Sequence, residues 1–172
     1  MIYTLLEPNH PLLHSPLPEI TAETEPEDRV ELTNNMAETM KHYGGIGLSA
    51  NQVGIALRMF VFGDKEHFIP CFNPKILEYG GPDMPIEEGC LTYPGLFVKI
   101  YRPEWVTVTF EDENRELHEE TFRELLARVF QHESDHMECI DFRSLAGRIS
   151  LNMPQRKVKR ATRKMKKVAE DK

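Results

Sequence analysis

Two histidines four positions apart, His132 and His136, constrain the fold of this chain more than any other feature. They bracket the motif His-Glu-Ser-Asp-His, in which Glu133 directly follows the first histidine. Residues i and i+4 share one face of a helix, so a helical segment brings both imidazoles to one metal ion and keeps the Glu133 carboxylate beside it as a base. The pattern outlines a hydrolytic metal site carried on a helix.

The residues before the motif predict that helix. The segment Thr121-Phe-Arg-Glu124 has the form of a capping box, which marks a helix start. Leu125, Val129, His132 and His136 then fall on one face. The imidazoles are therefore expected to point in the same direction as the apolar side chains.

The remaining elements are two helices and a β-rich middle. A capping box at Thr24-Glu25-Pro26-Glu27 and the pair Gly44-Gly45 predict a helix near 25–43. Pro154 and a narrow apolar stripe after it predict a last, basic helix. Short runs rich in branched and aromatic residues, separated by turn signals such as Asn73-Pro74 and Gly80-Gly81-Pro82, predict strands at 57–62, 68–72, 75–79, 97–101, 105–110 and 116–119, with a hairpin turn at 111–114.

This order of elements indicates the α+β class, because it lacks the helix-strand alternation of a parallel sheet. We expect short antiparallel β-sheets packed around a central metal-bearing helix, with an N-terminal helix and a basic C-terminal helix. The chain has 172 residues and is 40% hydrophobic, which is enough for one core and too short for two ordinary domains. A single domain over residues 1–172 is therefore predicted.

The sequence predicts a cytoplasmic protein with no membrane partner. No apolar run approaches the roughly 20 residues that span a bilayer, and the first residues lack the basic flank and apolar stretch of a signal peptide. Three cysteines, Cys71, Cys90 and Cys139, cannot all pair. A reducing compartment would leave their thiolates free to bind metal.

A hydrolytic metal site uses three protein ligands and one open position, so the two histidines need a third ligand. Cys139 lies on the same helical face as His132, but their Cα atoms would be about 10.5 Å apart and could share an ion only with strain. Cys90 is the better candidate, because Gly89 before it permits close approach of the backbone. Cys71 lies in an apolar strand-like run and is most simply a buried small hydrophobe.

A third informative segment is the run from Gly45 to Gln52, which contains small and apolar residues and ends in an amide. Small residues allow a substrate or strand to lie close, and the Gln52 amide could donate a hydrogen bond to a developing oxyanion. A glycine-rich turn after a helix is also common architecture. The spacing matches neither the dinucleotide nor the P-loop pattern.

Taken in order, the three segments resemble peptide deformylase. The family signature is Gly-x-Gly-Leu-Ala-Ala-x-Gln, then Glu-Gly-Cys-Leu-Ser, then Gln-His-Glu-x-Asp-His, and the matching residues are 45–52, 88–92 and 131–136. The resemblance implies removal of the N-formyl group from the initiator methionine of nascent chains, with release of formate. It also implies one divalent metal ion bound by Cys90, His132 and His136, expected to be Fe2+, with Zn2+, Ni2+ or Co2+ as alternatives.

The resemblance also implies roles for the residues around the metal. Glu133 would take a proton from water and pass it to the leaving amine. The Gln52 side chain and the Leu91 backbone N–H would stabilise the oxyanion, and the Gly45 backbone would help to hold the substrate. The candidates for an apolar pocket that accepts methionine, each equally explicable as core, are Ile46, Ile86, Leu125 and Val129.

The chain departs from the family pattern at three positions. Ser49 replaces the usual first alanine and Thr92 the usual serine, changes that the site is expected to tolerate. Cys139 stands where the family commonly has glycine, so packing at the end of the helix is expected to differ. Arg102 occupies a position that often pairs with the glutamate matching Glu88, which would support the ligands from outside.

Two other readings use the same residues. A metallopeptidase with this motif usually takes its third ligand downstream, whereas Cys90 lies upstream. In a structural metal module, Cys90, His132, His136 and Cys139 would close a four-ligand shell and leave no position for water. The C-terminal tail would then bind RNA.

The charge of the chain is strongly asymmetric. Residues 151–172 contain nine Lys or Arg and two acidic residues, whereas the rest contains 12 basic and 26 acidic residues. A basic tail predicts a polyanionic partner, although a solvated helix face explains the charge equally well. The basic C-terminal helix of some bacterial deformylases docks on the ribosome, so the resemblance implies a ribosomal partner here. No sequence-specific DNA binding is expected.

Overall fold

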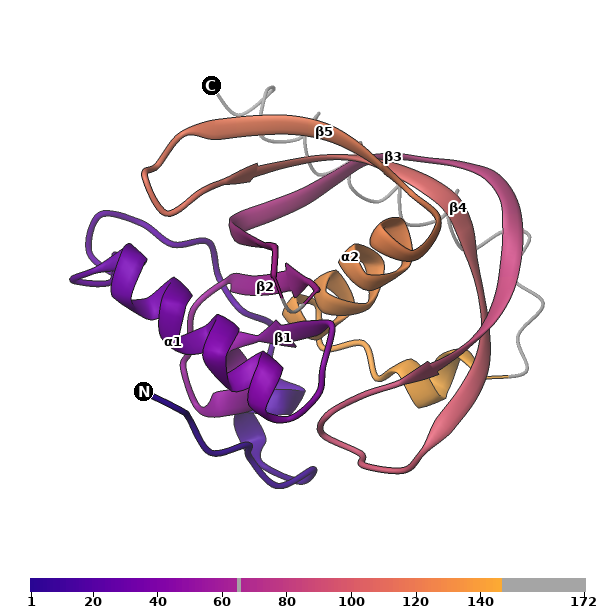
Figure 1. Ribbon diagram of the computed structural model, residues 1–172, viewed down its shortest axis with the longest axis horizontal. Helices are drawn as coiled ribbons and strands as arrows, with labels where there is room; N and C mark the ends of the chain where they lie inside the picture. The colour runs from indigo at the N-terminus through magenta and orange to yellow at the C-terminus, as the bar shows by residue number, and fades with distance from the viewer. Residues whose placement is uncertain (65, 147–172) are drawn as a thin grey trace.

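The computed structural model describes residues 1–64 and 66–146, which form one antiparallel sheet and two α-helices. The sheet has five strands in the order β1-β2-β3-β4-β5, so each strand pairs with its neighbour in the sequence. Figure 1 shows the long strands β3 and β4 curving around α2. The predicted C-terminal helix lies outside the described residues. The elements are α1 (Arg29–His42), β1 (Gly47–Ser49), β2 (Met59–Gly63), β3 (Phe68–Gly89), β4 (Phe97–Glu111), β5 (Leu117–Arg123) and α2 (Glu124–Met137), with short 3-10 helices at Pro11–His14, Ala50–Val53 and Phe142–Leu145.

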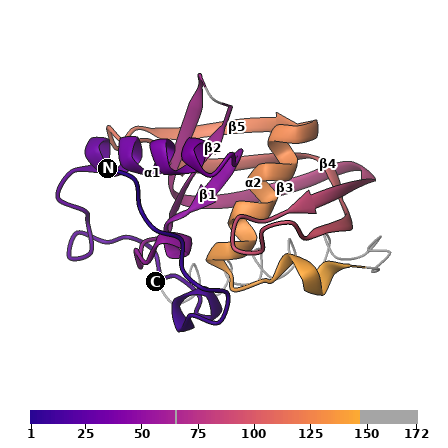
Figure 2. The same cartoon turned by 60° about the horizontal axis from the view of Figure 1, so that its bottom comes forward.

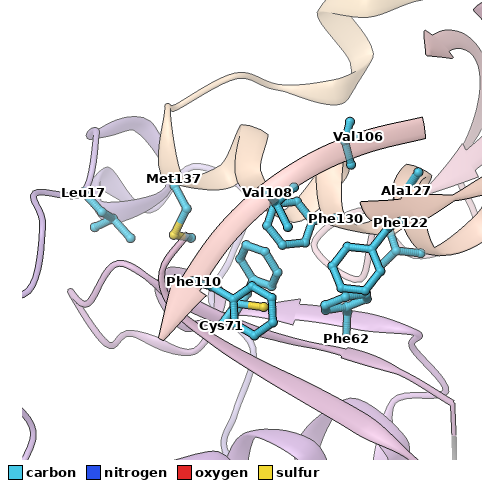
Figure 3. Close-up of a cluster of buried hydrophobic side chains, with 12 residues drawn as sticks. Leu17, Phe62, Cys71, Val106, Val108, Phe110, Phe122, Ala127, Phe130 and Met137 are labelled. Atoms are coloured by element: carbon cyan, nitrogen blue, oxygen red, sulfur yellow. The ribbon is translucent and has the colours of Figure 1, made fainter. Parts of the chain in front are cut away.

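Strand β2 separates the two main parts of the core. Successive side chains of a strand point to opposite faces, and both faces of β2 are buried. Met59 and Val61 pack with α1 residues Leu32, Met36 and Met40. Phe60 and Phe62 pack instead with residues of β4, β5 and α2, a cluster that also contains the fully buried Cys71 (Figure 3). Of the face that the sequence predicted to be apolar, only Val129 belongs to this cluster, which α2 joins mainly through Ala127, Phe130 and Met137, while Leu125 is exposed.

The strands are longer than the sequence predicted. Residues 68–72 and 75–79 belong to one strand, β3, and residues 97–101 and 105–110 both belong to β4. The expected turns at Asn73-Pro74 and Gly80-Gly81-Pro82 are irregularities in the pairing of β3 with β4. Asn73 and Gly81 take positive φ angles there, which lets the strand bend without ending. The hairpin turn after Glu111 is present, and the antiparallel arrangement is confirmed.

The segment that the sequence described as a glycine-rich turn contains an edge strand. Gly47–Ser49 form β1, which pairs antiparallel with β2, and a short 3-10 helix follows directly and contains Gln52. Too few residues are present for a strand pattern to be visible in the sequence. The consequence is that residues of the segment lie against α2.

Both predicted capping boxes are wrong. Helix α1 begins at Arg29, because the Asp28 side chain accepts a hydrogen bond from the Glu31 N–H, while the Thr24 hydroxyl closes a local turn with Thr21. Thr121 lies in β5 opposite Thr107, and α2 begins only at Glu124 without a side-chain cap. Figure 2 shows α2 crossing the long strands β3 and β4. No helix of the described residues has the length and apolar character needed to cross a membrane.

Candidate functional site

Helix α2 carries both histidines of the motif on its buried side. The rings of His132 and His136 have centroids 5.2 Å apart, and His132 is only 8% exposed. The spacing of four residues produces this arrangement, because it returns the second ring to the face of the first. The helix thus presents two nitrogen ligands toward one point.

Cys90 completes a group of three potential metal ligands. It follows directly after β3, and its Sγ lies 3.3 Å from His136 Nε2. The ligand atoms of Cys90, His132 and His136 all lie within 4.8 Å of one another. In a tetrahedral site with ordinary zinc bond lengths, such atoms lie about 3.3 to 3.6 Å apart. The three residues therefore fit a single metal ion.

The protonation of Cys90 suits a metal, and that of His132 shows what a metal must displace. Burial alone would raise the pKa of the Cys90 thiol, but hydrogen bonds with His132 and His136 lower it to about 5. Burial alone would lower the pKa of His132, but hydrogen bonds with Cys90 and Glu88 raise it to about 10. The sulfur is therefore a thiolate at neutral pH, which is the form that binds metals, whereas the proton held by His132 must leave when a metal binds.

Glu88 orients His132 from behind. Its Oε2 lies 3.0 Å from His132 Nδ1, which leaves the other ring nitrogen for the metal. Arg102 donates to both oxygens of Glu88 at 2.6 and 2.9 Å and to Asp135 Oδ2 at 2.8 Å. Burial alone would raise the pKa of Glu88, but His132 and Arg102 hold it well below its usual range. The Glu88–Arg102 pair expected from the family pattern is present.

Glu133 is buried between α2 and the edge strand β1. Its side chain is close to Gly47 and Ser49, which point to the same side of the strand. Ser49 Oγ donates a hydrogen bond of 2.7 Å to Glu133 Oε2. Burial raises the pKa of Glu133, although the charge of nearby His132 opposes this. A base with a raised pKa accepts protons more readily.

Gln52 lies beside the ligand Cys90. Its amide nitrogen donates to Thr92 Oγ1 at 3.0 Å and to Cys90 Sγ at 3.4 Å, and its oxygen accepts the Ser49 N–H. The sequence did not indicate the contact with Thr92. Leu91 follows Cys90 directly, and in the described part of the chain nothing accepts a backbone hydrogen bond from its N–H.

Gly45 lies against Leu91, with so little space that an added Cβ would be 2.7 Å from Leu91 Cδ1. The Gly45 N–H already donates to the Met40 carbonyl. If this residue holds a substrate, its carbonyl group remains as the available backbone contact. The predicted backbone contact of Gly45 with a substrate is therefore limited to its carbonyl group.

The four apolar pocket candidates differ in exposure. Ile46, Ile86 and Leu125 are 47%, 41% and 55% exposed, as expected of side chains that can contact a ligand. Val129 is 7% exposed and belongs to the aromatic core cluster. Its Cγ1 would nevertheless lie 2.8 Å from a Cβ added to Gly47, so it reaches the β1 side of the site.

Cys139 does not join the ligand group. Within residues 1–64 and 66–146, the group around His132 and His136 contains Cys90 as its only cysteine. Cys139 follows the end of α2 with a φ of 56°, and its thiol faces the Leu13 carbonyl at 3.9 Å. The closed four-ligand shell of a structural module is therefore not formed by these residues.

Arg128 is a residue of the site that the sequence reasoning missed. It is 5% exposed and lies one helical turn before His132. Its guanidinium donates to Glu88 Oε1 at 2.5 Å and to backbone carbonyls of β3 and β4. The available signal was a charged residue within the apolar stretch of the helix, since a buried arginine requires partners.

Comparison with known proteins gives one consistent result. The family model described as polypeptide deformylase matches residues 2–150. A peptide deformylase of Cytophaga hutchinsonii is 38% identical over 150 residues, which cover 83% of this chain and 80% of the relative. The crystal structure of peptide deformylase from Thermotoga maritima has a TM-score of 0.80 and 34% identity, covering 86% of this chain and 99% of that one. A peptide deformylase from Acinetobacter baumannii with bound Met-Ala-Ser has a TM-score of 0.77 and 25% identity, covering 84% and 98%.

Proposed function

The chain belongs to the polypeptide deformylase family, and from this membership we propose which of its residues perform the family's reaction. The enzyme is a hydrolase that removes the formyl group from the N-terminal methionine of nascent chains. One observation carries the assignment of residues. Cys90, His132 and His136 converge within 4.8 Å, with the buried Glu133 next to them on α2.

We propose that Cys90, His132 and His136 hold one divalent metal ion. A ligand set of one thiolate and two imidazoles suits borderline and softer metals, which supports Fe2+ with Zn2+, Ni2+ or Co2+ as alternatives. When bound, the metal supplies Lewis acidity and lowers the pKa of water. The Glu88 carboxylate supports the set by fixing the orientation of the His132 ring.

Glu133 acts as the general base in this proposal and later returns the proton to the leaving amine. Its burial, its raised pKa and its position next to a ligand support that role. The Gln52 amide and the Leu91 N–H donate to the oxyanion. Because both donations from Gln52 go to Thr92 and Cys90 in this structure, one of them must transfer to the substrate.

The substrate side chain is proposed to lie among Ile46, Ile86, Leu125 and Val129, with the Gly45 carbonyl as a backbone acceptor. The exposure of three of these apolar side chains supports the assignment. The peptide named in the Acinetobacter baumannii structure begins with methionine, which agrees with an apolar pocket for that residue.

The proposal extends to the setting of the reaction. Residues 1–172 would form a single catalytic domain that acts in the cytoplasm, where formylated chains emerge from ribosomes. The basic segment 151–172 would bind the ribosome, a role supported by its nine Lys or Arg against two acidic residues.

Release of formate tests the proposed function. The protein, purified without oxygen and loaded with Fe2+ or Ni2+, should release formate from a formyl-Met tripeptide. Glu133→Ala should lose this activity and keep its metal. Cys90→Ala should lose the metal, whereas the matched variant Cys139→Ala should retain it. A fully metallated sample that releases no formate contradicts the function, and the reverse result for the two cysteines overturns the ligand set.

A further inference from the structure

Arg128 is a buried cation whose hydrogen bonds, among the described residues, go to Glu88 and to two backbone carbonyls and not to a proposed metal ligand or to Glu133. Only 5% of its surface is exposed. It lies on α2, the helix that also carries the pocket candidates Leu125 and Val129. Burying a guanidinium is favourable only when its donors are satisfied by well-placed acceptors. The partners of Arg128 therefore indicate what it holds together.

These partners lie on both strands that face α2. Arg128 Nη1 donates to Glu88 Oε1 at 2.5 Å and to the Ile100 carbonyl at 3.2 Å, and Nη2 donates to the Met84 carbonyl. Ile86 lies midway between Met84 and Glu88 and is the register partner of Ile100. Arg128 thus bonds the backbone two residues before Ile86, the side chain two residues after it and the backbone of its partner on β4.

Ile86 on β3 and Leu125 on α2 are two of the exposed side chains proposed to receive methionine. Arg128 is three residues after Leu125, so its guanidinium connects the helix that carries one wall with the strand that carries the other. Hydrogen bonds from a planar cation are strong and directional. This side chain therefore links the two elements that carry the proposed walls.

Support of the metal ligand His132 depends on a different arginine, Arg102. Arg102 holds both oxygens of Glu88 and reaches Asp135, while Glu88 holds His132. Arg128 shares Glu88 Oε1 with Arg102, and its bond goes to that oxygen and not to Oε2, which faces His132. Loss of Arg128 would free the segment around Ile86, while the two Arg102 bonds to Glu88 would still hold the carboxylate that orients His132.

We propose that Arg128 is a positioning residue that sets the width of the apolar pocket and so the selectivity for methionine. This inference rests on the proposed function, because it uses the assignment of Ile86 and Leu125 to substrate binding. Pockets discriminate between apolar side chains by small differences in fit, so modest changes in width alter selectivity.

The test compares Arg128→Met with Arg102→Met in the metal-loaded enzyme. Substrates are formyl tripeptides that differ only in the first side chain, Met, Leu or Phe, and metal content is measured for each sample. Arg128→Met should keep its metal and kcat, raise KM for the methionine substrate about tenfold and reduce the preference for Met over Phe by about tenfold. Arg102→Met should lose metal or kcat and keep the preference in the metallated fraction.

Arg128→Lys provides a second variant if the first does not fold. A lysine presents one compact charge and cannot bridge the same acceptors, so it should also relax selectivity. An unchanged preference for Met over Phe in either variant, once folded and metallated, overturns the inference about Arg128. In that case formate release by the wild type still supports the proposed function. A wild type without formate release from any of the three substrates contradicts the proposed function itself.

Discussion

The Ser49 hydroxyl donates a hydrogen bond of 2.7 Å to Glu133 Oε2, across 84 positions of sequence. On the other oxygen, a Cβ added to Gly47 would lie 2.3 Å from Glu133 Oε1. The edge strand β1 therefore confines the carboxylate on two sides. The family pattern has alanine at the position of Ser49. Alanine has no hydroxyl to donate, so this hydrogen bond distinguishes the chain from the pattern.

Ser49→Ala tests whether the hydroxyl positions the base. Its removal leaves a buried carboxylate oxygen without that donor and gives the side chain more freedom. We expect kcat for a formyl-Met tripeptide to fall about 3- to 10-fold with KM and metal content unchanged. Steady-state kinetics on metal-matched samples measure this.

Ser134→Ala is the matched control for that variant. Ser134 lies next to Glu133 on α2, and its buried hydroxyl has no hydrogen-bond partner among the described residues. Its loss should leave kcat unchanged. Equal kinetics for Ser49→Ala and the wild type would show that the hydroxyl does not position Glu133.

The titration of Cys90 gives a prediction for the metal-free protein. Because His132 and His136 lower the pKa of Cys90 to about 5, its thiolate should persist from alkaline pH down to that value and be lost as pH falls below it. The ultraviolet thiolate absorbance after chelation, measured as wild type minus Cys90→Ser, should show this midpoint. Bound metal should move the loss to lower pH, because the proton must then displace the metal.

Cys71 provides the contrast in the matching difference, wild type minus Cys71→Ser. It is fully buried, and burial raises its pKa well above the ordinary value. It should therefore stay protonated across the range. A Cys90 difference spectrum with its midpoint in the ordinary thiol range would mean that the histidines do not stabilise the Cys90 thiolate.

Cys139→Gly should stabilise the protein. Cys139 takes a φ of 56° just after the end of α2, a conformation that glycine adopts without a steric penalty. Relief of this strain, less the lost packing of the thiol, should raise the free energy of unfolding by about 0.5 to 1 kcal/mol. Chemical denaturation at equal metal content measures the change.

Cys139→Ala separates strain from the chemistry of the thiol. Alanine keeps the Cβ and its clash, so this variant should not be stabilised. Both variants should retain their metal. If alanine stabilises as much as glycine, the backbone strain is not the cause.

Deletion of residues 152–172 tests the proposed ribosomal contact. The full chain should cosediment with ribosomes at low salt and dissociate at high salt, because exposed charges are screened. The truncated chain should not cosediment, yet should release formate from a free tripeptide, which shows that it is folded. Salt-sensitive cosedimentation that survives the deletion would rule out this role for the tail.

Local sequence rules predicted the parts of this fold that depend on a few neighbouring residues. The face shared by His132 and His136 follows from helical periodicity, and α2 carries them as expected. The same rules failed at Thr121 and at Asn73, where pairing with β4 extends a strand through a capping signal and a turn signal. Cross-strand hydrogen bonds outweigh weak local preferences at such positions.

What the sequence determined by itself was the set of chemical groups and the spacing of those on one helix. The tertiary structure decided which distant groups join them. Cys90 reaches His136 across 46 positions, and Arg128 reaches Met84 across 44. These contacts depend on the register and curvature of β3 and β4, which arise from long-range pairing and packing around α2. No local pattern records that geometry, so the roles of Ser49 and Arg128 became visible only in the folded chain.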